Sequence, residues 1–425
     1  MSSQQLLTEY QPYAAPIMEF NQRVISGGHG SYLVDVDGNQ YLDLSAGQFC
    51  SVLGHGDEQL AARVFSLSKK AVNVGASFLC EDVLYAAKAV HDICPEMNGK
   101  VFFLSTGAEA NECCLRYAKQ MSGHRNGVIS FDVGYHGLSL GTEGYSMGRQ
   151  YVKPQLANSF CIKAPVVYSK ENAARSDWEQ SVQEMEIILK QHHAEIAVAI
   201  FEPIVSTGGL LYPPKEFWSE IRRLCNEYGI YLAFDECQTG FGRTGTWFYY
   251  QQLENCVPDF LICAKGMGLG YPVAAVVFNG NTFPASSFVM HHVSSHQNDP
   301  FNAGLVQFGI QQIEKNGYLH ENTKKGSYML EKLKELAQKY PSIQNPRMCG
   351  LMGGFDINIQ SSDKKELAAK SAILAETGLK NGIVLQFGNF GKTVRLLPAY
   401  SISYEEIDYF IIQLGKTMAE LSDLF

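Results

Sequence analysis

Short apolar runs alternate with longer amphipathic stretches through the middle of the chain. The amphipathic stretches have apolar residues three and four positions apart, which is typical of helices, and cover residues 109–121, 178–191 and 216–228. The apolar runs have the length of strands and cover residues 101–104, 127–131, 196–201, 230–234, 260–263 and 273–278. Fully apolar strands separated by helices are typical of a sheet that is buried on both faces. The pattern therefore predicts an α/β fold with a large, mostly parallel sheet.

The two ends of the chain show a different pattern. Residues 30–44 have the form of a hairpin with Asp37 and Gly38 at its turn. Beyond about residue 304, long helical stretches alternate with a few strands. At 425 residues, the chain is longer than one core usually fills. We expect a large α/β domain over residues 50–304 and a smaller α+β domain built from both termini, residues 1–49 and 305–425.

Composition narrows the class of partners. The net charge of -9 and the pI near 5.7 argue against nucleic acid or an anionic membrane as the main partner. The 11 cysteines lack the spacing of metal ligands, so we expect no metal and free thiols in a reducing cytoplasm. The first residues lack the basic start and apolar core of a signal peptide, and no apolar run reaches the roughly 18 residues of a membrane span.

Chemically capable residues follow several of the predicted strands. Glu202, Asp235 and Lys265 each stand at or just beyond the end of an apolar run. In open α/β sheets, ligands bind beyond the carboxyl ends of the strands, so these side chains are expected to meet in one crevice.

Residues 105–109 lead from a strand directly into a helix. The free N–H groups and the positive dipole end of such a helix form a phosphate site. The same residues also form a capping box, Thr106 with Glu109, which any helix could use. From this stretch alone, both interpretations remain open.

Lys265 and Asp235 favour one cofactor when they are taken together. A lysine at a strand end is often a solvated stop, whereas one in an apolar crevice is a nucleophilic amine for Schiff bases. A carboxylate after a strand as apolar as residues 230–234 needs a cationic partner, either an arginine or a protonated pyridine nitrogen. A Schiff-base lysine, a pyridinium partner and a phosphate loop are the parts of a pyridoxal-phosphate (PLP) site. A nicotinamide-dependent oxidoreductase or a non-catalytic binding protein would give no reason for this combination.

Five stretches of the sequence resemble the class III aminotransferases of the fold type I PLP superfamily. The longest is FDECQTGFGRTG at residues 234–245, and the others are STGAEAN at 105–111, GYHG at 134–137, FEPI at 201–204 and AKG at 264–266. The resemblance covers essentially the whole chain. It implies a PLP fold type I enzyme, active as a homodimer with a shared active site, that moves an amino group between an α-amino acid and an α-keto acid by a ping-pong mechanism.

The resemblance also implies roles for individual residues. Lys265 would carry the cofactor as a Schiff base and move the substrate proton, and Asp235 would hold the pyridinium. Gln238 would bind the phenolate oxygen, and Tyr135 would stack on the ring. The remaining cofactor-binding residues implied by the matched motifs are Thr106, Gly107, Ala108 and His136.

Three further residues are implied for the shared site and the substrate. Ser295 occupies the position of a family threonine that reaches the phosphate from the other subunit, although this chain has serine there. Arg395 matches the arginine that binds the substrate α-carboxylate, for which a bidentate fork is well suited. Glu202 resembles the glutamate that can pair with this arginine when no carboxylate is bound.

Two alternatives within the family stay open. Residues 45–55 and 295–300 are similar to dialkylglycine decarboxylase, in which a glutamine at the position of Gln48 contacts the carboxylate. Gln48 is thus a candidate catalytic and substrate-binding residue for decarboxylation-dependent transamination, or else a structural turn residue. Amino-acid epimerases share the same general pattern. Phe49, Phe78 and Tyr400 are candidates for the pocket lining by position alone.

Overall fold

The computed structural model describes residues 1–16, 21–70, 73–75, 77–146, 158–168, 175–283, 292–361 and 363–425. Its α-helices are α1 (Ser3–Tyr10), α2 (Ala46–Phe49), α3 (Glu58–Ser68), α4 (Glu81–Ile93), α5 (Gly107–Met121), α6 (Arg175–His192), α7 (Lys215–Tyr228), α8 (Pro300–Lys315), α9 (Tyr318–Lys339), α10 (Lys364–Lys380) and α11 (Tyr404–Glu420). Its strands are β1 (Ile25–His29), β2 (Tyr32–Asp35), β3 (Gln40–Asp43), β4 (Lys100–Leu104), β5 (Gly127–Phe131), β6 (Ser159–Ile162), β7 (Ile196–Phe201), β8 (Tyr231–Asp235), β9 (Phe260–Cys263), β10 (Ala274–Phe278), β11 (Ile343–Cys349), β12 (Met352–Ile357), β13 (Ile383–Val384), β14 (Gln386–Gly388) and β15 (Thr393–Leu396).

A mostly parallel sheet forms the centre of the larger half of the molecule. Within the described residues it has seven strands in the order β4-β10-β9-β8-β7-β5-β6. Strands β6, β5, β7, β8 and β9 pair in parallel, and β10 runs antiparallel between β9 and β4. The α/β fold with a mostly parallel sheet is therefore confirmed. All six strands expected from the apolar runs are present, and β6 is an additional strand at the edge.

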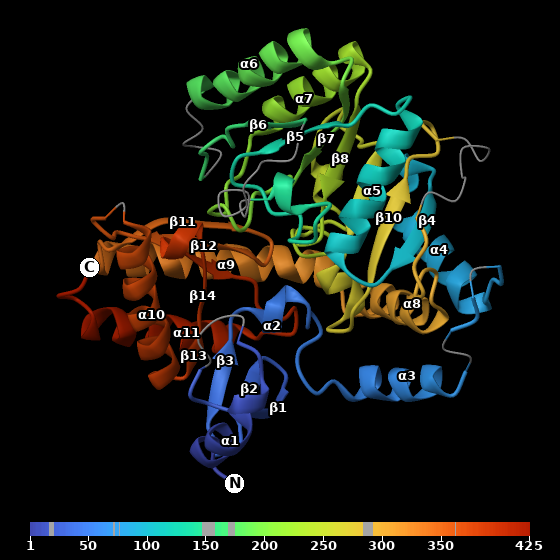
Figure 1. The fold of residues 1–425 in the computed structure, drawn as a ribbon. Coiled ribbons are helices and arrows are strands. Elements are labelled where there is room, and N and C mark those ends of the chain that lie inside the picture. Colours follow the sequence, from blue (N-terminus) through green and yellow to red (C-terminus); the bar gives the residue numbers. More distant parts are fainter. Residues whose placement is uncertain are drawn as a thin grey trace.

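Alternating side chains bury the two faces of this sheet against different helices. On β8, Ala233 points into a core that contains Cys113 and Cys114 of α5. Its neighbours Leu232 and Phe234 point into the other core, which contains Trp218 of α7 and other residues of α6 and α7. Figure 1 shows α6 and α7 together on one side of the strands and α5 on the other. Burial on both faces explains why the central strands are mostly apolar.

Segments from both ends of the chain meet in the smaller half. The expected hairpin is confirmed, since β2 and β3 pair antiparallel around a turn in which Gly38 has a φ of 87°. Strand β3 also pairs in parallel with β13, which joins Leu42 to Ile383. Strands β11, β12, β15 and β14 form a separate four-stranded sheet in this order. The boundaries near residues 50 and 305 remain a prediction.

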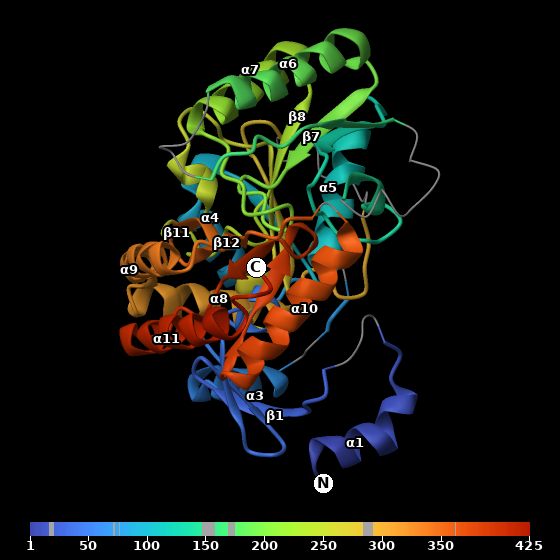
Figure 2. The ribbon, with the colours of Figure 1, turned by 90° about the vertical axis from the view of Figure 1, so that its left-hand side faces the viewer.

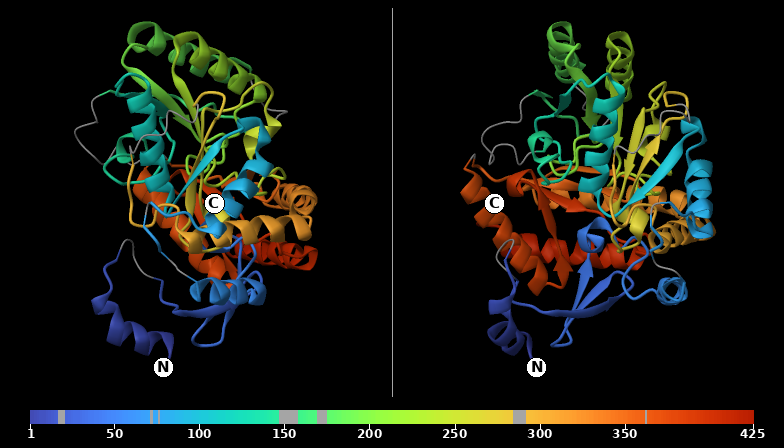
Figure 3. Two further views of the ribbon diagram at one scale, coloured as in Figure 1. Left: turned by 90° about the vertical axis from the view of Figure 1, so that its right-hand side faces the viewer. Right: turned by 45° about the vertical axis from the view of Figure 1, so that its right-hand side comes forward.

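The helices of the C-terminal part connect the two halves. Figure 2 shows α8, α9 and α11 stacked below the large sheet, and Figure 3 shows the N-terminal strands below the C-terminal elements. None of the helices in the described ranges is long and apolar enough to span a membrane. All eleven cysteines are free thiols.

Candidate functional site

A cavity of about 300 Å³ opens at the carboxyl end of the large sheet. Its walls come from the start of α5, the loop after β5, the end of β8 and the turn after β9. Seven of the residues proposed from the sequence line it together: Thr106, Gly107, Ala108, Tyr135, His136, Asp235 and Lys265. The parallel strand order thus brings together residues that lie up to 159 positions apart in the chain, from Thr106 to Lys265.

The first turn of α5 has the geometry of an anion cradle. Thr106 is the N-cap, and its Oγ1 accepts a hydrogen bond from Glu109 N at 3.2 Å. The helix itself offers no acceptor for the N–H groups of Gly107 and Ala108. A Cβ at Gly107 would lie 3.1 Å from Cys237 Sγ, so glycine keeps this end of the cavity open. The Glu109 carboxylate caps Ser105 N at 2.9 Å, so the capping function and the anion cradle coexist.

Asp235 is held at the base of the cavity by three donors. Its Oδ2 lies 2.9 Å from His136 Nδ1 and accepts a hydrogen bond from Asn111 Nδ2 at 2.9 Å. Its Oδ1 accepts a hydrogen bond from Cys237 N at 3.1 Å. Because an ionised carboxylate only accepts, His136 must carry its proton on Nδ1.

This environment keeps Asp235 ionised. Burial alone would raise the pKa of its carboxyl, but the hydrogen bond and the charge of His136 outweigh burial and lower the pKa of Asp235 to about 2. A buried carboxylate that stays charged at neutral pH is suited to a cationic ligand atom. The described part of the chain places no arginine in an ion pair with Asp235, so the alternative of an ordinary arginine salt bridge is wrong.

Lys265 lies just beyond the end of strand β9, as the sequence predicted. Strand β9 ends at Cys263, and Lys265 begins a 3-10 turn, Lys265–Gly268. Its φ of 49° lies in the left-handed region, which is uncommon for a residue with a side chain. Such conformations persist only where the surroundings enforce them, and they cluster at functional sites.

Glu202, Ser206 and Gln238 form a second cluster beside the cavity. Glu202 Oε1 accepts a hydrogen bond from Tyr135 N at 2.8 Å, which links the cluster to the cavity wall. Ser206 joins the other two residues, since its N donates to Glu202 Oε2 at 3.3 Å and its Oγ donates to Gln238 Oε1 at 2.7 Å. Burial raises the pKa of Glu202 to about 7, because neither bond brings a full positive charge to the carboxylate.

Arg395 is a buried guanidinium that makes no ion pair with a carboxylate of the described residues. Only 8% of it is exposed, and its Nε has no hydrogen-bond partner in the part of the chain that the structure describes. Its Nη1 lies 3.4 Å from Thr207 Oγ1, and the guanidinium carbon lies 4.7 Å from the ring centre of Phe49. Burial lowers the pKa of Arg395 to about 10, which the charge of Glu202 partly opposes. The two residues form no direct ion pair here.

The remaining expectations have separate outcomes. Gln48 is exposed on α2 and does not line the cavity, although Cys50 does. Ser295 is also exposed, and its backbone oxygen accepts a hydrogen bond from Asn73 Nδ2 at 2.6 Å. Of the three positions suggested for the pocket lining, Tyr400 is fully buried in the core and Phe78 is 70% exposed. Phe49 lies beneath Arg395.

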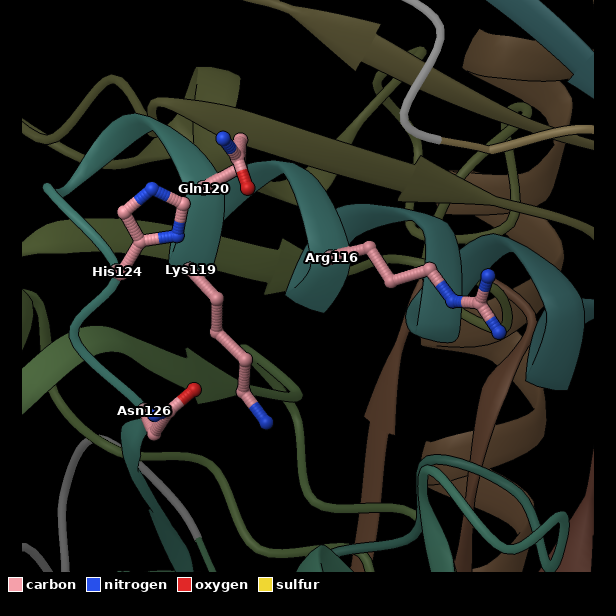
Figure 4. Close-up of a pocket in the computed structure, with 5 residues that line it drawn as sticks. All are labelled: Arg116, Lys119, Gln120, His124 and Asn126. Carbon is pink, nitrogen blue, oxygen red and sulfur yellow. The ribbon is translucent and has the colours of Figure 1, made fainter.

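A second hollow lies on the outer surface of α5. Its lining residues are Arg116, Lys119, Gln120, His124 and Asn126, none of which belongs to the cavity at Lys265. Figure 4 shows Arg116 directed away from Lys119 and Asn126. The hollow is therefore a feature of the helix surface and not a converging site.

Comparison with known proteins agrees with this arrangement. The family model described as "Aminotransferase class-III" matches residues 14–418. This chain belongs to the class-III aminotransferase family. The family match, together with the transaminases among its relatives and structural neighbours, identifies this chain as a PLP-dependent transaminase.

Relatives of this class-III chain match along almost their whole length. An acetylornithine aminotransferase of Methanothermobacter thermautotrophicus is 28% identical over 401 residues, covering 94% of each chain. An isoleucine 2-epimerase of Lentilactobacillus buchneri is 26% identical and covers 94% of this chain and 90% of its own. The crystal structure of a transaminase from the marine bacterium Virgibacillus superposes with a TM-score of 0.88 at 23% identity over 99% of both chains, which shows the shared fold.

The cavity fits the cofactor of the class-III family. The N–H groups of Gly107 and Ala108 would hold the phosphate, and the ionised Asp235 would hold the ring nitrogen. Lys265 lines the same cavity. The opening left by the absent Cβ at Gly107 is what a phosphate needs in order to approach the backbone.

Several residues of the site have no role in the sequence analysis. Asn111 and Cys237 fall inside the quoted motifs, and Ser206 and Thr207 lie two and three positions after the FEPI stretch. Their position beside known motifs was the available signal. Their partners lie far away in the sequence, as in the contact of Asn111 with Asp235 across 124 positions.

Proposed function

We propose that this class-III enzyme moves an amino group between an α-amino acid and an α-keto acid in two successive half-reactions. The observation that carries this proposal is Arg395, a buried guanidinium whose Nε has no acceptor and which pairs with no carboxylate in the described ranges. A guanidinium fork recognises a planar carboxylate by paired, charge-assisted hydrogen bonds. An α-carboxylate would supply the missing acceptor.

The cavity residues have complementary roles in this proposal. Lys265 would hold the cofactor through its Nζ, and the same amine can take and return the proton of the substrate Cα. Asp235 would hold the ring nitrogen in its protonated state, because His136 keeps its carboxylate ionised and the hydrogen bond from Asn111 helps to orient it. Gln238 would contact the phenolate oxygen. PLP, when bound, supplies an electron sink for the charge that develops at Cα.

One experiment separates this reaction from its alternatives. The PLP-loaded enzyme is mixed with a panel of α-amino acids, one of them α,α-dialkylated, without any keto acid, and the products are identified by mass spectrometry. A keto acid with the same number of carbons supports the proposal. A product one carbon shorter would indicate decarboxylation, in which Gln48 would have a catalytic role.

Epimerisation is the second candidate, because an isoleucine 2-epimerase is among the relatives that match over most of this chain. An amino acid that loses its optical purity while no keto acid forms would replace the main proposal by this one. Lys265→Ala is the control for all three candidate reactions. It should abolish product formation and also the covalent attachment of the cofactor after borohydride reduction.

We also propose a homodimer with a shared active site. Four large apolar side chains are exposed in the single chain: Leu138, Leu140, Tyr271 and Val293. Leu138 and Tyr271 themselves line the cavity. The exposed hydroxyl of Ser295 would reach the phosphate of the second subunit. The eleven free thiols support a cytoplasmic location.

A further inference from the structure

The turn that holds Phe49 has an unusual backbone. Within α2, Ala46 has a φ of 44°, Gly47 of 69° and Phe49 of 67°. Residues with a Cβ avoid this region, so neighbouring groups must enforce the conformation. The turn follows β3 directly and lies next to Cys50, which lines the cavity.

A buried carboxylate braces this turn from one side. Asp43 is 1% exposed, and its Oδ2 accepts a hydrogen bond from Gly47 N at 2.7 Å. Ser45 donates to Asp43 Oδ1 from both its N, at 2.9 Å, and its Oγ, at 2.6 Å. His55 Nε2 lies 2.9 Å from the same carboxylate.

The strand next to Arg395 braces the turn from the other side. Gln386 of β14 lies opposite Arg395 of β15, and its Nε2 donates to Gly47 O at 3.0 Å. The turn and the arginine are thus fixed to the same strand pair. Gly388 leaves room for the arginine, because a Cβ there would lie 3.2 Å from Arg395 Cδ.

The ring of Phe49 is therefore held against a guanidinium that has no carboxylate partner among the described residues. The guanidinium carbon lies 4.7 Å from the ring centre, and Phe49 is 5% exposed. An aromatic face attracts a cation, and the attraction strengthens when water is excluded. It leaves the N–H groups of the arginine free for other acceptors.

We propose that Phe49 is a positioning residue for substrate specificity, which seats Arg395 so that it is ready for a carboxylate in both half-reactions. This inference rests on the proposed function and deepens it. Because Arg395 makes no ion pair with Glu202, no pair has to break before a carboxylate binds. The donor and the acceptor therefore both carry an α-carboxylate, and amines without one leave the guanidinium buried and unpaired.

The test compares variants that keep or remove the aromatic face. Phe49→Leu and Phe49→Met remove the ring at similar volume, and Phe49→Tyr keeps it. The decrease of the PLP absorbance of the holoenzyme during a single turnover is measured at increasing substrate concentrations. The substrates are the best α-amino acid donor and 1-phenylethylamine, which has no carboxylate. We expect Leu and Met to weaken the apparent affinity for the amino acid about 5- to 30-fold, the range for a partly desolvated cation–π contact. The rate at saturation and the response to the amine should change by less than about threefold, and Phe49→Tyr should resemble the wild type.

A purely structural role for Phe49 would give a different result. The amino acid and the amine would then lose affinity equally, or the amino acid would lose none, and either outcome overturns the inference. Melting temperatures of the holoenzymes identify which of the Leu and Met variants is folded and valid for the comparison.

A binding measurement separates this inference from the proposed reaction. Titration with 4-methylpentanoate, which carries a carboxylate but no amino group, reports on Arg395 without turnover. If the wild type binds it and Phe49→Leu weakens binding, the inference stands even if no amino acid reacts. If the wild type transaminates and the Phe49 variants bind the probe equally well, the inference alone fails.

Discussion

The hydrogen bonds of single residues decide the charge state of the cavity. Asn111 Nδ2 donates to Asp235 Oδ2 at 2.9 Å and to His136 O at 3.1 Å, so one amide fixes both the carboxylate and the loop that carries Tyr135. The motif stretches identified Asp235 and Lys265 because such residues stand at strand ends. Asn111 falls inside one of these motifs, but the sequence does not show that it supports Asp235, since this contact is set only by the folded sheet.

Asn111→Leu should weaken cofactor binding. The substitution removes one charge-assisted donor from Asp235, and hydrogen bonds to charged groups contribute about 1.5–3 kcal/mol. Because Asn111 acts through Asp235, we expect the dissociation constant of PLP to rise about tenfold, measured by absorbance titration of the apoenzyme. Asn126→Leu, in the hollow on the outer surface of α5, is the matched control and should leave this constant unchanged. Equal affinities of the two variants would contradict the role of Asn111.

Glu202→Gln should change how stability depends on pH. Burial raises the pKa of Glu202 to about 7 in the folded protein, above its ordinary value of 4.5. The contribution of the protonated acid is therefore complete below pH 4.5 and is lost as the pH rises through about 7. Glutamine stays neutral, so the unfolding free energy of the variant relative to the wild type should increase by on the order of 2 kcal/mol between pH 5 and pH 8. Chemical denaturation of both apoproteins at these two pH values measures the difference, and parallel profiles would refute it.

At the scale of elements, the hydrophobic pattern predicted the interior of the sheet better than its margins. Strands β7 and β9 are fully buried and apolar throughout, and β8 is apolar up to Asp235 at its end. Strand β6 lies at the sheet edge and is only partly buried, so its sequence carries a weak signal. Strand β11 contains a proline and exposed polar residues, so the hydrophobic pattern gives only a weak signal for this strand as well.

Helix α9 packs too closely on a turn to accept even a methyl group at Gly326. A Cβ there would lie 1.9 Å from the backbone oxygen of Gly350, in the turn between β11 and β12. We expect Gly326→Ala to destabilise the protein by about 2 to 3 kcal/mol, as other overpacked sites do, despite the better helix propensity of alanine. Urea denaturation measures this value. Gly415→Ala in α11 is the matched control, because its Cβ would meet Leu336 Cδ1 at 3.4 Å and should cause no loss.

At the scale of the whole molecule, the exposed apolar side chains near the cavity indicate which surface a second copy would cover. The sequence could not locate this surface, because the exposure of Leu138, Leu140 and Val293 is decided by the fold. Isolated apolar residues on a surface are normal, whereas a group beside a site marks an interaction.

Leu140→Asp should therefore disrupt assembly. Leu140 is 83% exposed in the single chain, and a charge there would be buried against the second subunit. We expect sedimentation velocity to show a dimer for the wild type and a species of half that mass for the variant. Ile412→Asp on α11, where the side chain is 57% exposed, is the control and should remain dimeric. A wild-type protein that sediments as a monomer would refute the shared active site.

The parallel pairing of β3 with β13 has a consequence for folding while the protein is synthesised on the ribosome. Leu42 finds Ile383 only after the intervening 340 residues have been translated. At about 5–20 residues per second, this takes roughly 20 to 70 s. During that time β3 exposes an open edge, which is a template for pairing with other chains. The nascent enzyme thus depends on whatever shields this edge, such as a chaperone, until β13 emerges.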